Sequence, residues 1–358
     1  MKLVSIQDLI PGMRVGVDIY SMWNQLVVPK NTILTQNIIE RLRDYEIPYI
    51  KISIDDGEPQ NNTSEDLNLS YAERVKSSRT FKEFRKEFTN NIPVIQDAFN
   101  DVVKKHAPLD IDTLLEKTAN VFSKAEGTNI FDMIHNMREY DDSTYVHCLN
   151  VSLICNVLGK WLNYSDSDIE ILVLSGMMHD VGKLTIPDSI IKKPGKLTDE
   201  EYKLIQTHAA RGFEILQDQK LPESVKYAAL MHHERCDGSG YPSKLSYDKL
   251  DRFARLVSIA DVYDAMTSAR VYRDSLSPFT VVDIFEKEGL QKYDPECILV
   301  FLEHIVDTYL NYRVLLNDGR TGEIVLINKH ALSRPLIKLE DGFLDLSLNK
   351  DVMIEKIL

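Results

Sequence analysis

The sequence has no long apolar run, few cysteines and no excess of basic residues, and each absence excludes a class of protein. No apolar stretch approaches the roughly 18 residues that cross a bilayer, and residues 1–8 lack the features of a signal peptide. The four cysteines, Cys148, Cys155, Cys236 and Cys297, are scattered without a CxxC pair, which argues against a disulfide framework and a zinc knuckle. We therefore expect a soluble cytoplasmic protein without a membrane span.

The net charge limits the kinds of partner that the protein can bind. A formal charge of −13 over 358 residues argues against bulk nucleic-acid binding through a basic surface. It does not exclude a small anionic substrate, because bound metal ions would dominate the local field. The sequence leaves open a homodimer formed through helices.

The apolar pattern changes along the chain and predicts a mainly α protein. We expect an all-helical metal-hydrolase bundle with a small module at each end. The predicted parts are a small N-terminal α/β module (1–54), a polar linker (55–66), connector helices (67–125), a helical catalytic domain (126–310) and a C-terminal antiparallel β module (311–358). The last assignment rests on alternating apolar and polar residues, as in strands. These segments are separated by Asp318-Gly319 and Asp341-Gly342, which favour hairpin turns.

One predicted connector helix has a basic face. It comprises Lys76, Arg79, Lys82, Arg85 and Lys86. Such a face is found on helices that bind nucleotides or lie against membranes, but it is more often solvated. We favour the solvated connector.

Histidines and aspartates in the helical region form a pattern that core packing does not explain. His179-Asp180 is followed by the pair His232-His233, and His208 lies between them. Neutral imidazoles with interleaved carboxylates suit a first-row transition metal. The full set of predicted ligands is His147, His179, Asp180, His208, His232, His233 and Asp261. Seven donors are too many for one tetrahedral ion and suit two neighbouring ions.

Asp180 is the best candidate for a bridge, because each carboxylate oxygen can bind one metal. Ions held roughly 3.5–4 Å apart can share an activated water and act on a phosphoester. We expect His147, His179 and Asp261 to complete one ion, and the remaining three histidines to complete the other. Asp264 lies one helical turn after Asp261 and is expected to orient a ligand.

Other residues near these motifs suit a phosphate-containing substrate. Lys183 would place a positive charge over a phosphate, and Tyr241, within a loop with two glycines, could stack on a base. Arg270 and Arg273 follow Asp261 and could grip phosphates or face guanine edges.

Together these motifs resemble the HD-GYP family, a branch of the HD phosphohydrolases that hydrolyses the bacterial second messenger cyclic di-GMP. The resemblance covers about residues 130–309. Its motifs are His147, His179-Asp180-Val181-Gly182-Lys183, Ile186-Pro187-Asp188, Lys193-Pro194-Gly195-Lys196-Leu197-Thr198, Thr207-His208, residues 232–242, and Asp261-Val262-Tyr263-Asp264-Ala265-Met266-Thr267. The family pattern makes the seven predicted ligands metal-binding. It makes Lys183, Gly240, Tyr241, Arg270 and Arg273 substrate-binding, with Asp180 and Lys183 taking part in catalysis.

The resemblance implies a cyclic di-GMP phosphodiesterase with two divalent ions, most often iron and alternatively manganese, and a metal-bridging hydroxide as nucleophile. Members with a third metal carry a glutamate where this sequence has Ser143. We therefore expect linear pGpG as the main product rather than GMP. Two alternatives stay open. One is a non-catalytic cyclic di-GMP receptor that signals through its flanking modules, and the other is a phosphohydrolase of other nucleotides.

Overall fold

The structure is a computed structural model in which the chain separates into two compact units, residues 1–69 and residues 70–358. It describes residues 2–6, 9–10, 12–17, 19–20, 26–28, 32–34, 38–39, 42–43, 49–52, 71–125, 128–137, 143–193, 195–268 and 276–358. The predicted linker (55–66) and the predicted substrate residues Arg270 and Arg273 lie outside the described residues.

The first unit contains two small antiparallel strand pairs. β1 (Lys2–Ser5) pairs with β4 (Tyr49–Ile52), and β2 (Ile19–Tyr20) pairs with β3 (Leu26–Val28). The unit has its own hydrophobic core, in which Ile39 and Leu42 are buried with strand residues.

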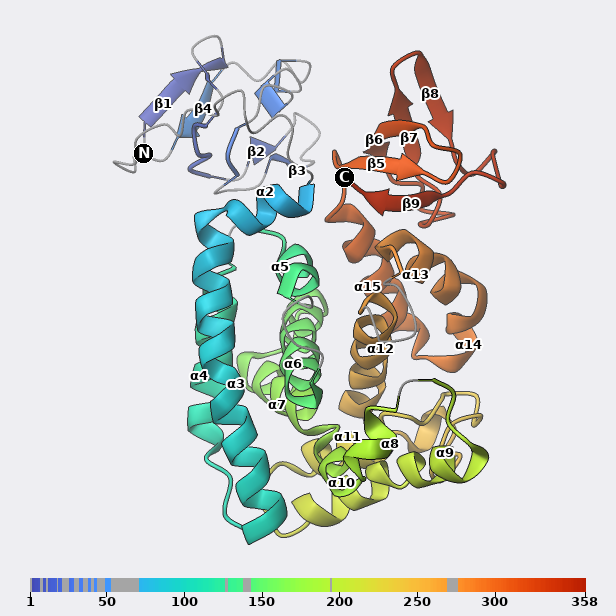
Figure 1. The fold of residues 1–358 in the computed structure, drawn as a ribbon. Helices are drawn as coiled ribbons and strands as arrows, with labels where there is room; N and C mark the ends of the chain where they lie inside the picture. The colour runs from blue at the N-terminus through green and yellow to red at the C-terminus, as the bar shows by residue number, and fades with distance from the viewer. Residues whose placement is uncertain are drawn as a thin grey trace. The chain divides into compact units, whose positions relative to one another are not determined.

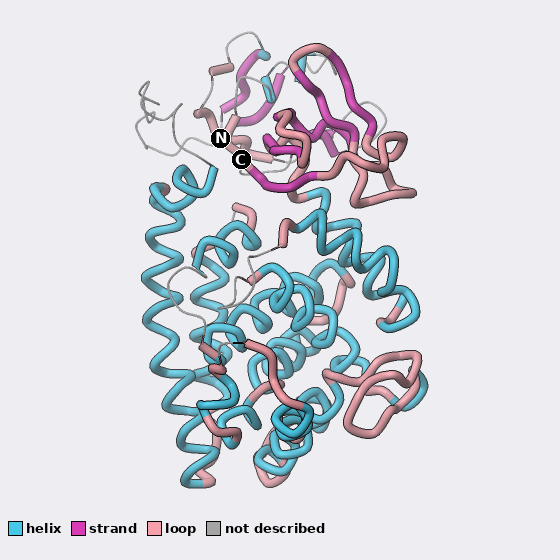
Figure 2. The backbone as a smooth tube through the Cα atoms, turned by 45° about the vertical axis from the view of Figure 1, so that its right-hand side comes forward, coloured by secondary structure: helices cyan, strands magenta, loops and turns pink. Residues whose placement is uncertain are grey.

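The second unit is predominantly helical, which confirms the predicted fold class (Figures 1 and 2). Its helices before residue 200 are α2 (Tyr71–Ser77), α3 (Arg79–Lys105), α4 (Ile111–Ser123), α5 (Ile130–Met137), α6 (Thr144–Trp161), α7 (Asp166–Met178), η3 (Val181–Thr185), α8 (Asp188–Ile191) and α9 (Asp199–Gln206). The later ones are α10 (His208–Leu216), α11 (Glu223–Met231), η4 (Tyr247–Lys249), α12 (Arg252–Thr267), α13 (Pro278–Ile284), η5 (Phe285–Gly289), α14 (Leu290–Lys292) and α15 (Pro295–Asp307).

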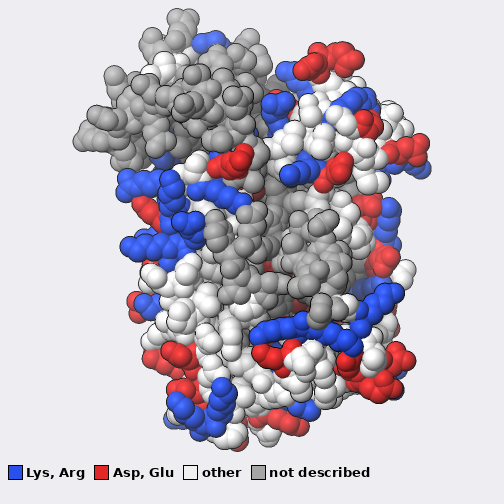
Figure 3. All heavy atoms as spheres, viewed as in Figure 1, with Lys and Arg blue, Asp and Glu red and all other residues white. Residues whose placement is uncertain are grey.

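Helix α3 is not solvated on all sides, because one of its faces packs against the helical bundle. Phe81, Phe84 and Phe88 on one face are at most 1% exposed and belong to the same core as α6 and α12. Burial of an aromatic side chain contributes roughly 1.5–3 kcal/mol. Of the basic residues, Lys76 lies in α2 and the other four lie in α3, and none of them is buried. Figure 3 shows Lys and Arg side chains gathered over α2 and the start of α3. The phenylalanines at helical spacing therefore determine which face of α3 packs against the bundle.

Helices α6, α7 and α12 form the centre of the unit. Apolar residues lie all around α6 and α7, as expected for helices covered on every side. Gly176 permits the close contact of α7 with α6, because a Cβ there would lie 3.1 Å from the backbone of Ser152. These close-packed helices form a rigid frame for the side chains that they carry.

The C-terminal residues form a five-stranded antiparallel sheet in the order β8-β7-β6-β5-β9. The strands are β5 (Arg313–Leu316), β6 (Thr321–Leu326), β7 (Leu336–Leu339), β8 (Gly342–Asp345) and β9 (Ile354–Ile357). Gly319 and Gly342 have φ angles of 86° and 148°, as the predicted hairpin turns require. β9 pairs with β5 at the edge of the sheet.

The sheet is joined to the helices by polar contacts. The Glu286 carboxylate accepts hydrogen bonds from the backbone N–H of Leu332 at 2.6 Å and of Ser333 at 3.1 Å. The Tyr312 hydroxyl donates to Asp132 at 2.9 Å. Within the described part of the chain, none of the helices combines the length and apolarity that crossing a membrane requires.

Candidate metal centre

Five helices bring the predicted ligands together. His147 lies in the first turn of α6, and His179-Asp180 follows the last turn of α7. The other four ligands are His208 at the start of α10, His232 and His233 after the end of α11, and Asp261 within α12. Most of the ligands thus occupy helix ends, and the packing of the helices fixes the distances between them.

The first ligand group surrounds His147 Nε2. This atom lies 3.1 Å from Asp261 Oδ1, 3.3 Å from His179 Nε2 and 3.5 Å from Asp180 Oδ2. His179 Nε2 lies 3.4 Å from the same Asp180 oxygen. One nitrogen or oxygen from each of His147, His179 and Asp180 falls within a sphere small enough for one ion.

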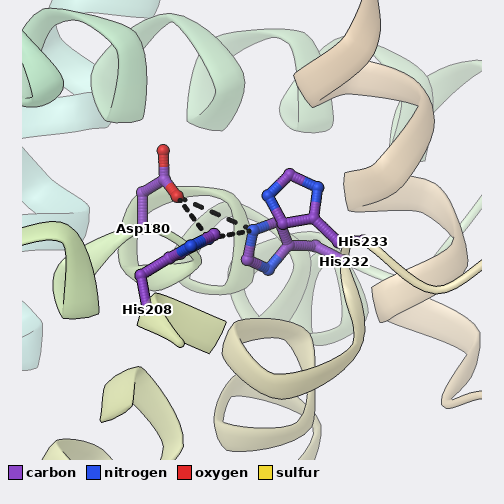
Figure 4. A group of neighbouring side chains, drawn as sticks. All are labelled: Asp180, His208, His232 and His233. Atoms are coloured by element: carbon purple, nitrogen blue, oxygen red, sulfur yellow. Dashed lines mark hydrogen bonds and ion pairs between the residues drawn. The ribbon is translucent and has the colours of Figure 1, made fainter. Parts of the chain in front are cut away.

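The second ligand group meets the other oxygen of Asp180 (Figure 4). Asp180 Oδ1 lies 3.3 Å from His208 Nε2 and 3.6 Å from His232 Nε2. Together with His233, these residues also place one ligand atom each within reach of a single ion. Each Asp180 oxygen therefore faces its own set of imidazoles, which is the arrangement of a bridging carboxylate.

The imidazoles are oriented by their second nitrogens. Nδ1 of His179 donates to the carbonyl of Gly176 at 2.7 Å, and Nδ1 of His208 donates to that of Ile205 at 2.6 Å. His232 Nδ1 lies 3.0 Å from the carbonyl of Ala228. Because a carbonyl only accepts, these contacts fix the proton on Nδ1 and leave the Nε2 lone pair facing the centre.

Asp264 orients the remaining imidazole of the first group. Its Oδ2 lies 2.8 Å from His147 Nδ1. Although burial lowers the pKa of His147, hydrogen bonds to Asp261 and Asp264 outweigh burial and raise this pKa to about 9. A cation that binds at His147 Nε2 therefore replaces a proton.

The second group is electrostatically different. Burial lowers the pKa of His232 to about 4, although Asp180 acts in the opposite direction. Burial and the neighbouring His232 also hold the pKa of His233 well below its usual range. Both imidazoles are therefore neutral at pH 7, so their lone pairs are available to a metal.

The donor set fits two divalent ions. Asp180 is fully buried, and its Oδ1 has no hydrogen-bond donor among the described residues. Despite burial, Lys183 and His179 hold the pKa of Asp180 well below its usual range, so the buried carboxylate is ionised. A buried anionic oxygen without a donor is costly unless a cation compensates it.

Lys183 contacts the Asp180 carboxylate directly. Its Nζ lies 2.5 Å from Asp180 Oδ2, and its side chain is 23% exposed. The preceding Gly182 is required, because a Cβ there would lie 2.0 Å from the carbonyl oxygen of His208. This close approach of η3 to α10 keeps Lys183 at the centre.

The loop after His233 covers one side of the centre. The Tyr241 ring stacks on the His233 ring, with centroids 4.6 Å apart. Gly240 permits the chain to fold back on itself, because a Cβ there would lie 2.4 Å from the Cα of Glu234. The buried Glu234 carboxylate accepts from the N–H of Ser243 at 2.6 Å and of Leu245 at 3.0 Å.

Our interpretation of the sequence missed Glu234. A carboxylate directly after two metal ligands resembles a further ligand, whereas its oxygens here hold the loop that carries Tyr241. Only its position before a loop rich in glycine hinted at this function. The predicted Arg270 and Arg273 lie outside the described residues.

Comparisons with known proteins show the family to which the chain belongs. The HD domain family model matches residues 118–297. A cyclic di-GMP phosphodiesterase of Pseudomonas aeruginosa is 32% identical over 57% of this chain and 49% of its own length. A 3′3′-cGAMP-specific phosphodiesterase of Vibrio cholerae is 35% identical over 53% of this chain and 36% of its own.

A third relative is a cyclic di-GMP phosphodiesterase response regulator of Xanthomonas campestris, 29% identical over 71% of this chain and 66% of its own length. The chain thus spans less than two thirds of each of these three proteins. The match to the family model covers half of the chain and contains every predicted metal ligand. The chain belongs to the HD domain family, and its resemblance to the HD-GYP branch is confirmed.

Proposed function

We propose that this protein is a metal-dependent phosphodiesterase that hydrolyses cyclic di-GMP to linear pGpG. The observation that carries the proposal is the pair of ligand groups joined by the buried Asp180 carboxylate. Relatives named as cyclic di-GMP phosphodiesterases support the substrate. Relatives named for 3′3′-cGAMP make that cyclic dinucleotide the second substrate to test.

We propose two divalent transition-metal ions, iron or manganese, held by the seven predicted ligands. Imidazole and carboxylate donors suit both metals, and no cysteine belongs to either ligand group among the described residues. When bound, such a pair of ions supplies Lewis acidity toward a phosphate and activates water at neutral pH. The protein supplies the frame: oriented imidazoles, an ionised bridging carboxylate, and helix packing that keeps them in place.

We propose that five residues bind the substrate: Lys183, Gly240, Tyr241, Arg270 and Arg273. Lys183 places a positive charge at the centre. Burial lowers the pKa of Lys183, but the neighbouring Asp180 carboxylate outweighs burial, so the pKa is raised overall. A cation on Asp180 Oδ2 would release Lys183 from that oxygen, so that its ammonium becomes available to a phosphate. The Tyr241 ring beside His233 offers an aromatic surface to a base.

We propose that the reaction stops at pGpG. Ser143, where three-metal members carry glutamate, is the N-cap of α6, and its hydroxyl accepts from the Val146 N–H at 3.4 Å. A neutral hydroxyl compensates a further divalent ion poorly. Helix α6 begins at Thr144, and the neighbouring Asp141 and Asp142 lie outside the described residues.

Substitution of Ser143 tests this assignment. Ser143→Glu should raise the metal content per chain and shift the product from pGpG toward GMP. Ser143→Ala removes the cap, at a cost of about 1 kcal/mol in stability, without adding an anion. Product composition followed by chromatography should therefore change in Ser143→Glu alone. Rapid GMP formation by the unmodified chain without accumulation of pGpG would contradict the proposal.

A turnover assay separates phosphodiesterase from receptor. Iron- or manganese-loaded full chain is incubated with cyclic di-GMP, 3′3′-cGAMP or other nucleotide phosphoesters, and the products are identified. We expect pGpG from cyclic di-GMP and loss of turnover with a chelator. Cyclic di-GMP that binds but is recovered intact would favour the non-catalytic receptor. The cytoplasmic location and a homodimer through helices stay predictions.

A further inference from the structure

Arg235 lies in the turn that carries two of the metal ligands past the end of α11. The helix ends at Met231, so it supplies no donor of its own for the carbonyls that follow. Nη1 of Arg235 donates to the carbonyl of His232 at 3.3 Å and to that of Glu234 at 2.9 Å. A basic side chain that donates to carbonyls at a helix C-terminus holds this end, and its positive charge suits the helix dipole.

The same guanidinium lies over an aromatic ring. Its central carbon is 4.9 Å from the centre of the Tyr293 ring, which is within the range of a cation–π contact. Tyr293 is buried and packs edge-on against the Phe285 ring, with centroids 5.3 Å apart. Next to Arg235, the Cys236 N–H donates to the carbonyl of Lys292 at 2.8 Å. The turn after α11 is thus attached to the end of α14.

This turn determines where the imidazoles of the second ligand group lie. His232 and His233 extend from it, and His232 Nε2 lies 3.6 Å from Asp180 Oδ1 (Figure 4). Ligands of one ion must keep their places to within about 0.5 Å. The ligands of the first group lie on or next to α6, α7 and α12, which close packing already holds. A contact that fixes the turn after α11 therefore acts on the second group.

We propose that Arg235 is a positioning residue for the metal ion of the second ligand group. It holds the turn that carries His232 and His233 against the Tyr293 ring, and it acts on the ion only through these two ligands. The inference rests on the binuclear centre proposed above. Residues that orient metal ligands in this way typically change metal affinity by about 10–100-fold.

Chains that keep only one intact ligand group can locate the effect. His147→Ala leaves the second group intact, and His208→Ala leaves the first group intact. In the His147→Ala chain, Arg235→Gln should weaken manganese binding by about 10–100-fold in a calorimetric titration of the metal-free full chain. In the His208→Ala chain, the same substitution should leave the affinity unchanged.

Two further variants separate the contacts of Arg235. Arg235→Lys keeps the positive charge but loses the planar guanidinium, so it should recover part of the affinity that Arg235→Gln loses. Tyr293→Leu removes the aromatic ring and should weaken binding at the second group by about threefold. Arg252→Gln is the matched control, because Arg252 also lies over a ring, that of Phe253 at 4.5 Å, in the first turn of α12. It should leave the affinity of both one-group chains unchanged.

The outcomes distinguish this inference from the proposed function. Equal manganese affinity of the His147→Ala chain with and without Arg235→Gln would overturn the inference. Equal losses in both one-group chains would also overturn it, because they would indicate general destabilisation of the fold. If Arg235→Gln does not fold, Arg235→Lys and Tyr293→Leu provide the same comparison. Binding of fewer than two ions by the chain without substitutions would contradict the binuclear centre, and the inference would fall with it.

Discussion

The two ligand groups of the metal centre share Asp180 but differ in charge. The first group adds a second carboxylate, Asp261, and its His147 has a raised pKa. The second group adds only neutral imidazoles, and the pKa values of His232 and His233 are lowered. In the proposed centre, the charges of the two ions would therefore be compensated unequally, and both ions would depend on Asp180.

Loss of Asp180 should have the largest effect, because one residue serves both groups. We expect Asp180→Ala to retain well below one ion per chain and to show no turnover. Metal content by elemental analysis measures this directly. Asp318→Ala, at an exposed hairpin, is the matched control and should keep both ions. Retention of two ions by Asp180→Ala would show that the carboxylate is not a bridge.

Loss of a histidine from one group should affect one ion. His147→Ala and His208→Ala should each retain about one ion per chain, because each leaves the other ligand group intact. The ion left in His208→Ala should resist a competing chelator better, because two carboxylates compensate its charge. Equal resistance in both variants would remove the distinction between the groups.

Asp264→Asn should have a smaller effect. The amide oxygen can still accept from His147 Nδ1, but the negative charge is lost. Partners of this kind typically change metal affinity by about 10–100-fold. We expect a loss of this size confined to one ion in a chelator titration, with Asp248→Asn on the surface as control. A similar loss at both ions would indicate general destabilisation of the fold.

Lys183→Ala and Arg270→Ala should leave both ions in place. Removal of one charge-assisted contact to a phosphate costs roughly 1.5–3 kcal/mol, equivalent to a loss of about 10–100-fold in kcat/KM for cyclic di-GMP. Metal analysis on the same samples separates substrate contact from metal loss. Unchanged kinetics in both variants would remove these residues from the substrate site.

The sequence predicted which imidazoles and carboxylates lie together, because these residue types are distinctive in the sequence. Imidazoles and carboxylates at His179-Asp180 and His232-His233 stand out in an apolar helical background, and the structure places them together. It also brings Asp264 to His147, as the one-turn spacing from Asp261 suggested.

Features that depend on tertiary packing were not predictable in the same way. The 2.0 Å approach of a Gly182 Cβ to the His208 carbonyl involves residues far apart in the chain. The strand β9 is short, and its pairing partner is distant in the sequence: Ile354 of β9 pairs with Leu316 of β5, which lies 38 residues earlier.

The most direct test of the account is the position of the bound metals. Crystals of manganese-loaded full chain would be measured for anomalous scattering near the Asp180 carboxylate. We predict two peaks about 3.5–4 Å apart, one beside His147 and His179 and one beside His208 and His232. A single peak, or two peaks that do not share Asp180, would contradict the binuclear centre.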